Sequence, residues 1–281
     1  MGLGEAITDF VFRTINRQNH VRDAVYLDTN AWSALAKRQI PFEPLLKWVE
    51  QNGYYLWMSR FSLSELAGDT RLYRPFAELL QNFPILIMDY GDNEFKGVPW
   101  YSVEISYQQR FRIEKDDVDE WVNEYTNGPM RDARMKVLED GKTFGPAIEK
   151  ELSEIPSSRP RDWSGFPMQM EKHLRLKCEQ QGVASDEAAI QNLECFIGER
   201  LSHSVIYWRF FISRQKWKPS DYMDYLHTMD MAYARAVITE NNLTECIRQV
   251  ARKTKIMTPE VYPYSEFLPD PFGWEAKNNK R

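Results

Sequence analysis

The stretch AVYLDTNAWSALAK, residues 24–37, joins a short apolar run to a carboxylate and then to a helical pattern. The run is flanked by charge and ends at Asp28, which predicts a buried strand over 24–28. An unpaired carboxylate at the end of a buried strand costs free energy. Asp28 therefore needs either a partner or a use, and its position also suits a helix N-cap.

Similar short apolar runs at 54–59, 236–239 and 255–259 predict three further strands. Helical patterns lie between and after them, at the ranges 30–38, 41–52 (with a stop at Gly53), 62–68 and 241–254. Strands that alternate with helices are typical of a parallel sheet covered by helices. We therefore expect an α/β fold with a central parallel sheet.

The segment between these blocks has a different pattern. Residues 91–215 carry long runs with helical periodicity, which Gly and Pro clusters divide at 127–129, 141–146 and 156–167. We expect a discontinuous α/β domain at 20–90 and 216–262 with a helical insertion at 91–215. Pro and Gly in the last residues, 263–281, predict an irregular C-terminal tail.

Composition limits the classes of protein. The chain has 281 residues, a net charge of −5 and an apolar fraction of 43%, which suit a globular protein with a sizeable core. Its three cysteines are far apart and odd in number, which argues against a disulfide framework. No apolar run reaches the roughly 18 residues of a membrane span, and the N-terminus lacks a secretory signal layout. We expect a cytoplasmic protein without a membrane segment.

Four acidic residues lie at strand ends or in the first turns of helices in the α/β blocks: Asp28, Glu65, Asp224 and Glu240. Ligand sites of parallel sheets lie at the carboxyl ends of the strands, so we expect these acids to converge. Converging carboxylates repel one another unless a cation neutralises them, and hard cations such as Mg²⁺ or Mn²⁺ prefer oxygen ligands. Metals held in this way suit phosphoryl chemistry.

Several of these residues also have a simpler interpretation or a rival. Glu65 is an ordinary first-turn acid if only the helix dipole favours it. Asp221 is an alternative to Asp224, although its earlier position suits support of the helix start. His227, one turn after Asp224, either orients a ligand or contacts substrate, or it is a packed core histidine.

Cationic residues offer candidate phosphate contacts. Lys37 and Arg60 lie close in sequence to the acids and are the preferred candidates, although both also suit plain surface positions. The run YWRFFISRQKWK, 207–218, interleaves aromatic and basic residues, a pattern that can stack bases and hold phosphates. We favour the alternative for this run, an amphipathic helix whose aromatic side chains belong to the core.

These residues resemble the PIN domain, a family of metal-dependent ribonucleases with a Rossmann-like fold of three α/β/α layers. The resemblance covers about half of the chain, 24–88 and 219–260. It rests on four motifs: YLDTN (26–30), SLSEL (62–66), DYLH (224–227) and VITE (237–240).

The resemblance implies a role for each matching residue. The family's metal-binding acids fall on Asp28, Glu65 and Asp224, and its Asp-x-x-His context places His227. The turn after the first strand would be shaped by Thr29 and Asn30.

The chain departs from the family pattern in two ways. The gap between Glu65 and Asp224 is far longer than in compact PIN toxins because of the insertion, and the fourth acid is displaced. The family commonly has Asp two positions after the strand-ending Thr, which is Thr239 here. Asn241 holds that position in this chain, and Glu240 stands one place earlier. Either Glu240 supplies the fourth carboxylate through its longer side chain, or the fourth ligand is weak.

The sequence and the resemblance together predict a divalent-metal-dependent endoribonuclease, in which metal-activated water cleaves the phosphodiester bond of RNA. A regulatory protein partner, an oligomer and a setting in toxin–antitoxin or anti-phage defence fit such an enzyme. The alternative is a catalytically weak PIN-like module that binds protein or RNA through its insertion. A haloacid dehalogenase phosphatase needs a second Asp where Asn30 stands, and flap endonucleases carry more acids.

Overall fold

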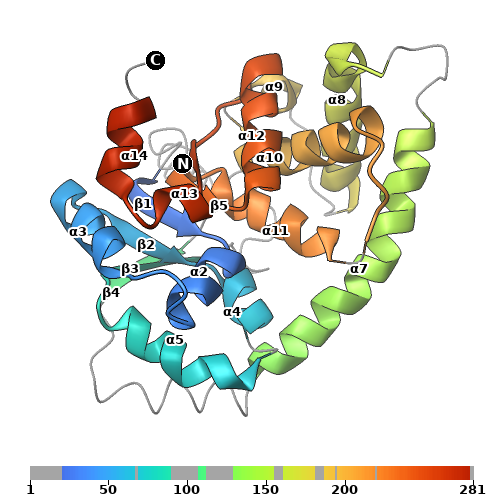
Figure 1. Ribbon diagram of the computed structural model, residues 1–281. Coiled ribbons are helices and arrows are strands. Elements are labelled where there is room, and N and C mark those ends of the chain that lie inside the picture. Colours follow the sequence, from blue (N-terminus) through green and yellow to red (C-terminus); the bar gives the residue numbers. More distant parts are fainter. Residues whose placement is uncertain are drawn as a thin grey trace, which may run out of the picture.

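The computed structural model describes residues 21–66, 69–89, 107–111, 129–154, 161–180, 187–193, 195–218 and 220–278. Its centre is a six-stranded sheet with the order β4-β3-β2-β1-β5-β6 (Figure 1). Five neighbouring strands are parallel, and β4 joins the edge antiparallel to β3. The strands are β1 (Val21–Leu27), β2 (Tyr55–Met58), β3 (Ile85–Asp89), β4 (Tyr107–Phe111), β5 (Ala234–Thr239) and β6 (Glu260–Pro263).

Helices connect the strands and cover the sheet. They are α2 (Thr29–Ala36), α3 (Glu43–Asn52), α4 (Arg60–Leu66), α5 (Tyr73–Leu80), α7 (Pro129–Ser153), α8 (Phe166–Gln180), α9 (Glu187–Gln191), α10 (Ile197–Ile206), α11 (Asp221–Met231), α12 (Asn241–Lys253), α13 (Tyr264–Phe267) and α14 (Pro271–Asn278). Short turns complete them: the 3-10 segments η1 (Thr70–Leu72) and η5 (Trp163–Gly165) and the π-helical turn η6 (Tyr207–Ile212).

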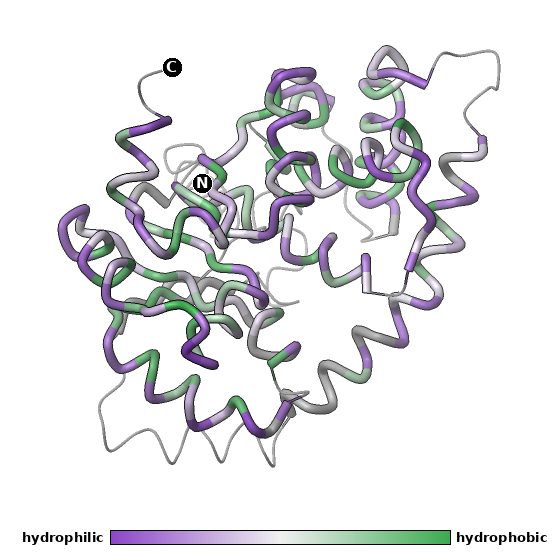
Figure 2. Tube along the Cα trace, in the orientation of Figure 1, coloured by the Kyte–Doolittle hydropathy of each residue, from purple (hydrophilic) through white to green (hydrophobic). Residues whose placement is uncertain are grey.

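The alternation of side chains along the strands creates a hydrophobic cluster on each face of the sheet. Val25 and Ile238 join one cluster with residues of α2, α3 and α5. Tyr26 and Val237 join the other with residues of α8, α10, α11 and α12. Burial on both faces explains why these strands are nearly continuous apolar runs. Hydrophobic and hydrophilic residues alternate along the helices (Figure 2).

The sheet confirms the α/β prediction in its main part and corrects it at the edges. The predicted strand over 255–259 is wrong, because the sheet strand begins only at Glu260. Pro263 ends β6 at the outer edge of the sheet, where a missing N–H is tolerated. The tail is not irregular either, since α13 and α14 pack beside β6 and α3.

The region 91–215 is largely helical where it is described, as predicted, but β4 belongs to the sheet. The expected break at 141–146 is wrong, because α7 continues through it. Gly145 has a packing reason there: a β-carbon would stand 2.0 Å from Trp217 Nε1. The acidic run 114–120 lies outside the described residues. Within the described part, no helix is long and apolar enough to cross a membrane.

Candidate active site

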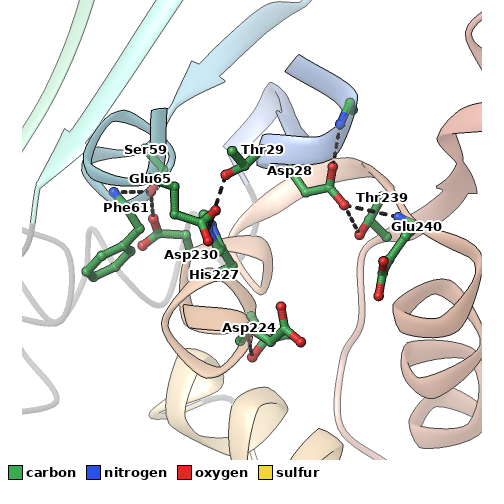
Figure 3. A network of polar contacts seen from close by, with 12 residues as sticks. Asp28, Thr29, Ser59, Phe61, Glu65, Asp224, His227, Asp230, Thr239 and Glu240 are labelled. Atoms are coloured by element: carbon green, nitrogen blue, oxygen red, sulfur yellow. Dashed lines mark hydrogen bonds and ion pairs between the residues drawn. The ribbon is translucent and has the colours of Figure 1, made fainter. Parts of the chain in front are cut away.

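A pocket of about 320 Å³ lies at the carboxyl ends of β1 and β5. Its wall contains the four predicted acids, Asp28, Glu65, Asp224 and Glu240 (Figure 3). The acids come from four separate segments: the β1–α2 junction, α4, α11 and the β5–α12 junction. Thr29, Asn30 and His227 line the same pocket, so the structure brings together most of the residues that the sequence selected.

Asp28 is 6% exposed, and hydrogen-bond donors of the protein surround it. Its Oδ1 accepts from the Ala31 backbone at 2.7 Å, so Asp28 is the N-cap of α2. Its Oδ2 accepts from the Thr239 hydroxyl at 2.5 Å and from the Glu240 backbone at 3.0 Å. Burial raises the pKa of Asp28, and these three hydrogen bonds offset only part of that rise. Both candidate roles, cap and site acid, therefore meet in one side chain.

Glu65 is paired with His227 across the pocket wall. His227 Nε2 donates to Glu65 Oε2 at 3.0 Å, and Nδ1 is hydrogen-bonded to the Tyr26 hydroxyl. Burial alone would lower the pKa of His227, but Glu65, Asp230 and Asp224 outweigh it and leave that pKa raised. His227 is therefore a buried residue that is hydrogen-bonded on both ring nitrogens, to an acid of the pocket wall and to Tyr26.

Asp224 is paired with Arg209, a residue of the helical region. Arg209 Nη1 donates to Asp224 Oδ2 at 2.7 Å, and Nη2 donates to Asp221 Oδ1 at 2.7 Å. Asp221 is the first residue of α11, and its Oδ2 accepts from the backbone N–H of Lys218, which precedes the helix. This contact agrees with the expectation that Asp221 supports the helix start. Burial raises the pKa of Asp224 more than Arg209 lowers it.

Glu240 is half-buried and is the N-cap residue of α12, without a side-chain capping bond. Burial raises the pKa of Glu240, and the charges of Asp224 and Asp28 raise it further. Glu240 therefore lies beside two other carboxyl groups of the pocket, Asp224 and Asp28. Neighbouring carboxyl groups of this kind favour a bound cation.

The donor set fits a hard divalent cation, because four carboxylates face one pocket. As the side chains stand, no three His, Cys, Asp or Glu residues in the described part are close enough to hold a metal ion. Two of the acids are bound by protein side chains instead: His227 binds Glu65, and Arg209 binds Asp224. A cation at this site would have to share these two acids with their protein partners.

The remaining predicted residues have different outcomes. Thr239 is part of the site through its bond to Asp28, and Asn30 is an exposed residue of the pocket wall. Lys37 lies away from the acids, because it is the C-cap residue of α2 and lines another pocket. Arg60 begins α4, but its side chain lies outside the described set.

The sequence did not single out two contacts of the site, Tyr26 with His227 and Arg209 with Asp224. Tyr26 belongs to the buried strand and shows no signal beyond its type. The basic and aromatic run 207–218 was the one sequence feature that pointed to Arg209. The expectation that aromatic side chains of this run belong to the core is confirmed for Tyr207 and Phe211, which are buried. The side chain of Arg209 is also largely buried and binds Asp224, an acid of the pocket wall.

Comparison of the chain with protein-family models, with curated proteins and with solved structures gives no match. The inference of function therefore depends on the chemistry of the pocket.

Proposed function

We propose that this protein is a divalent-metal-dependent endoribonuclease whose active site is the pocket of Asp28, Glu65, Asp224 and Glu240. One observation carries the proposal: four acids from four segments far apart in sequence line a single pocket at the carboxyl ends of parallel strands. Ligand sites of α/β sheets lie at this position. Helices on both faces of a largely parallel sheet support the PIN-like, three-layer interpretation.

Each residue has a distinct task in this proposal. Asp28, Glu65, Asp224 and Glu240 would hold Mg²⁺ or Mn²⁺, which supplies activation of water and stabilisation of charge on the phosphate. Thr239 fixes one oxygen of Asp28 through its hydroxyl. His227 orients Glu65, and Tyr26 fixes the ring of His227 from the other nitrogen. Together these contacts hold the ligand side chains before the substrate binds.

The proposed substrate is RNA, and the helical region 91–215 would restrain it or bind a regulatory protein. A nuclease that acts on cellular RNA needs control, which favours a toxin–antitoxin or anti-phage role. The acids of the site agree with a cation requirement, because a phosphodiester is repelled by neighbouring carboxylates such as Asp28 and Glu240.

The test is cleavage of a labelled single-stranded RNA and a matched DNA, with Mn²⁺, with Mg²⁺ and with chelator. We expect wild-type protein to cut RNA only in the presence of metal, and Asp28→Asn to lose cutting. Glu266→Gln, which changes an exposed acid on α13 away from the pocket and the helical region, is the control and should cut as wild type does. Cutting that persists in chelator or in Asp28→Asn would contradict the proposal.

The second candidate function is a binding module without catalysis. The observation that favours it is the full hydrogen bonding of Asp28, whose two oxygens already accept three bonds from the protein. Folded protein that cuts neither nucleic acid at high concentration would support this candidate. Retention of the RNA on the protein in chelator would then identify what it binds.

A further inference from the structure

Arg209 binds Asp224, an acid of the pocket wall, from an unusual piece of backbone. It lies in η6, a π-helical turn that follows α10 directly. Such turns inside helices are rare and occur frequently at functional sites. The side chain of Arg209 is 10% exposed and has three polar partners: Asp221, Asp224 and Gln215, whose Oε1 is 3.1 Å from Nε.

The two carboxylates that bind Arg209 differ in their surroundings. The side chain of Asp221 is 6% exposed, whereas that of Asp224 is 37% exposed and lines the pocket. Each carboxylate uses a different nitrogen of the guanidinium. Loss of Asp224 to another cation would therefore leave Arg209 still paired with Asp221 and Gln215, so that no unpaired charge is buried.

We infer that Arg209 is a positioning residue that shares Asp224 with the bound cation and thereby limits the cation affinity of the pocket. The inference rests on the proposed function, since it assigns Asp224 to the cation site. A guanidinium bound to one carboxylate oxygen stands within a few ångströms of a cation on the other oxygen. At this distance like charges repel appreciably even near a protein surface.

This arrangement gives the helical region a direct effect on the acid pocket. Arg209 belongs to the segment 195–218, while the other hydrogen bonds of the acids come from α2, the end of β5 and α11. A conformational change in η6 would therefore move the positive charge of Arg209 relative to Asp224 without any change in the sheet.

The test is Mn²⁺ binding measured by titration calorimetry on the full chain. Arg209→Gln should bind Mn²⁺ about ten-fold more tightly than wild type, because the competing charge is gone. Arg209→Lys keeps the charge and should stay close to wild type. Asp221→Asn removes the second carboxylate, commits Arg209 to Asp224 and should weaken Mn²⁺ binding.

Opposite changes in Arg209→Gln and Asp221→Asn are the decisive result, since a merely structural ion pair would make both variants bind alike. Equal weakening in both, or no change in Arg209→Gln, would overturn the inference while the cation site itself stands. Absence of Mn²⁺ binding in every protein would overturn the proposed cofactor as well. If Arg209→Gln does not fold, unaltered affinity in Asp221→Asn overturns the inference and weakened affinity supports it.

Discussion

Two clusters of glutamate, histidine and tyrosine share helix α11 and differ in their exposure. The pocket cluster consists of Glu65, His227 and Tyr26, and the side chain of its glutamate is 31% exposed. The buried cluster consists of Glu199, His173 and Tyr225, and its glutamate is 1% exposed. Tyr225 and His227 are two positions apart on α11, so one helix serves both clusters.

Charge balance separates the two clusters further. In the buried cluster Glu199 accepts from the Tyr225 hydroxyl at 2.6 Å and from His173 at 3.0 Å, and Lys177 lies 3.4 Å away. Burial alone would raise the pKa of Glu199, but Lys177 and these hydrogen bonds lower it to about 2. The carboxylate of Glu199 thus links its own helix α10 to α8 and α11, and Lys177 balances its negative charge.

The pocket cluster has the same residue types, but Glu65 faces a cavity that three other acids share. The comparison teaches that residue types do not distinguish a structural ion from a site acid. Access to a cavity and unbalanced neighbouring charge do. We therefore expect loss of the buried glutamate to affect folding and loss of the pocket glutamate to affect function.

The largest expected effect concerns the buried cluster. Glu199→Gln removes the buried carboxylate charge that pairs with Lys177 and accepts a hydrogen bond from His173. Loss of one partner of such a buried pair should lower the free energy of unfolding by about 3 kcal/mol. Urea denaturation at pH 7 measures this change. Glu266→Gln, an exposed glutamate on α13, is the control and should stay within about 0.5 kcal/mol of wild type.

The same variant has an expected dependence on pH. The pKa of Glu199 is about 2 in the folded protein, against an ordinary value of 4.5. Its contribution to stability is therefore present above about pH 4.5 and is lost as the pH falls toward 2. The gap between wild type and Glu199→Gln should narrow over that range. A gap that stays constant would show that the loss is one of packing and not of charge.

The second effect concerns the pocket cluster. Glu65→Gln should lower the rate of RNA cleavage by about 100-fold or more, since it removes one carboxylate from the proposed cation site. Its stability should fall by no more than about 1 kcal/mol, because the Glu65–His227 pair is partly exposed to solvent. Cleavage at the wild-type rate by this variant would assign Glu65 a structural role like that of Glu199.

The pocket could be predicted from the sequence because parallel strands deliver their carboxyl ends to one edge. Asp28 and Thr239 end neighbouring strands, so their contact follows from the strand order. Lys37 lies outside the acid pocket because the eight residues of α2, at about 1.5 Å each, separate it from Asp28 by roughly 12 Å. A residue close in sequence to a site acid can therefore lie far from the site when a helix separates the two.

The rest of the site depends on packing that a sequence pattern does not encode. Arg209 meets Asp224 only because the chain turns at 213–218 and returns along α11. The buried cluster was not predicted either, since Glu199, His173 and Tyr225 lie on three helices whose mutual placement is tertiary. At the sheet edge, β6 was missed because it has four residues and ends in Pro.

The third effect is stabilisation by metal. Mn²⁺ that binds only the folded protein should raise the melting temperature by several degrees at 100 times its dissociation constant, since binding then adds about 2.7 kcal/mol. Asp28→Asn should show a smaller rise, whereas Glu199→Gln should show the full rise from a lower starting temperature. A melting temperature of wild type that does not respond to millimolar Mn²⁺ would count against the cation site.

The smallest expected effect is the pH dependence of the pocket cluster, measured in chelator so that no metal competes. The pKa of His227 is raised above its ordinary value of 6.5, mainly by Glu65 against the opposing effect of burial. A raised histidine pKa contributes stability that is complete below about pH 6.5 and is lost as the pH rises through the folded value. The gap between wild type and Glu65→Gln, below about 1 kcal/mol, should therefore narrow as the pH rises above 6.5. The two clusters would then lose their stabilisation at opposite ends of the pH scale, the buried one in acid and the pocket one in base. A gap for Glu65→Gln that widens with rising pH would show that His227 is neutral in the folded protein and that Glu65 binds it as a plain hydrogen-bond acceptor.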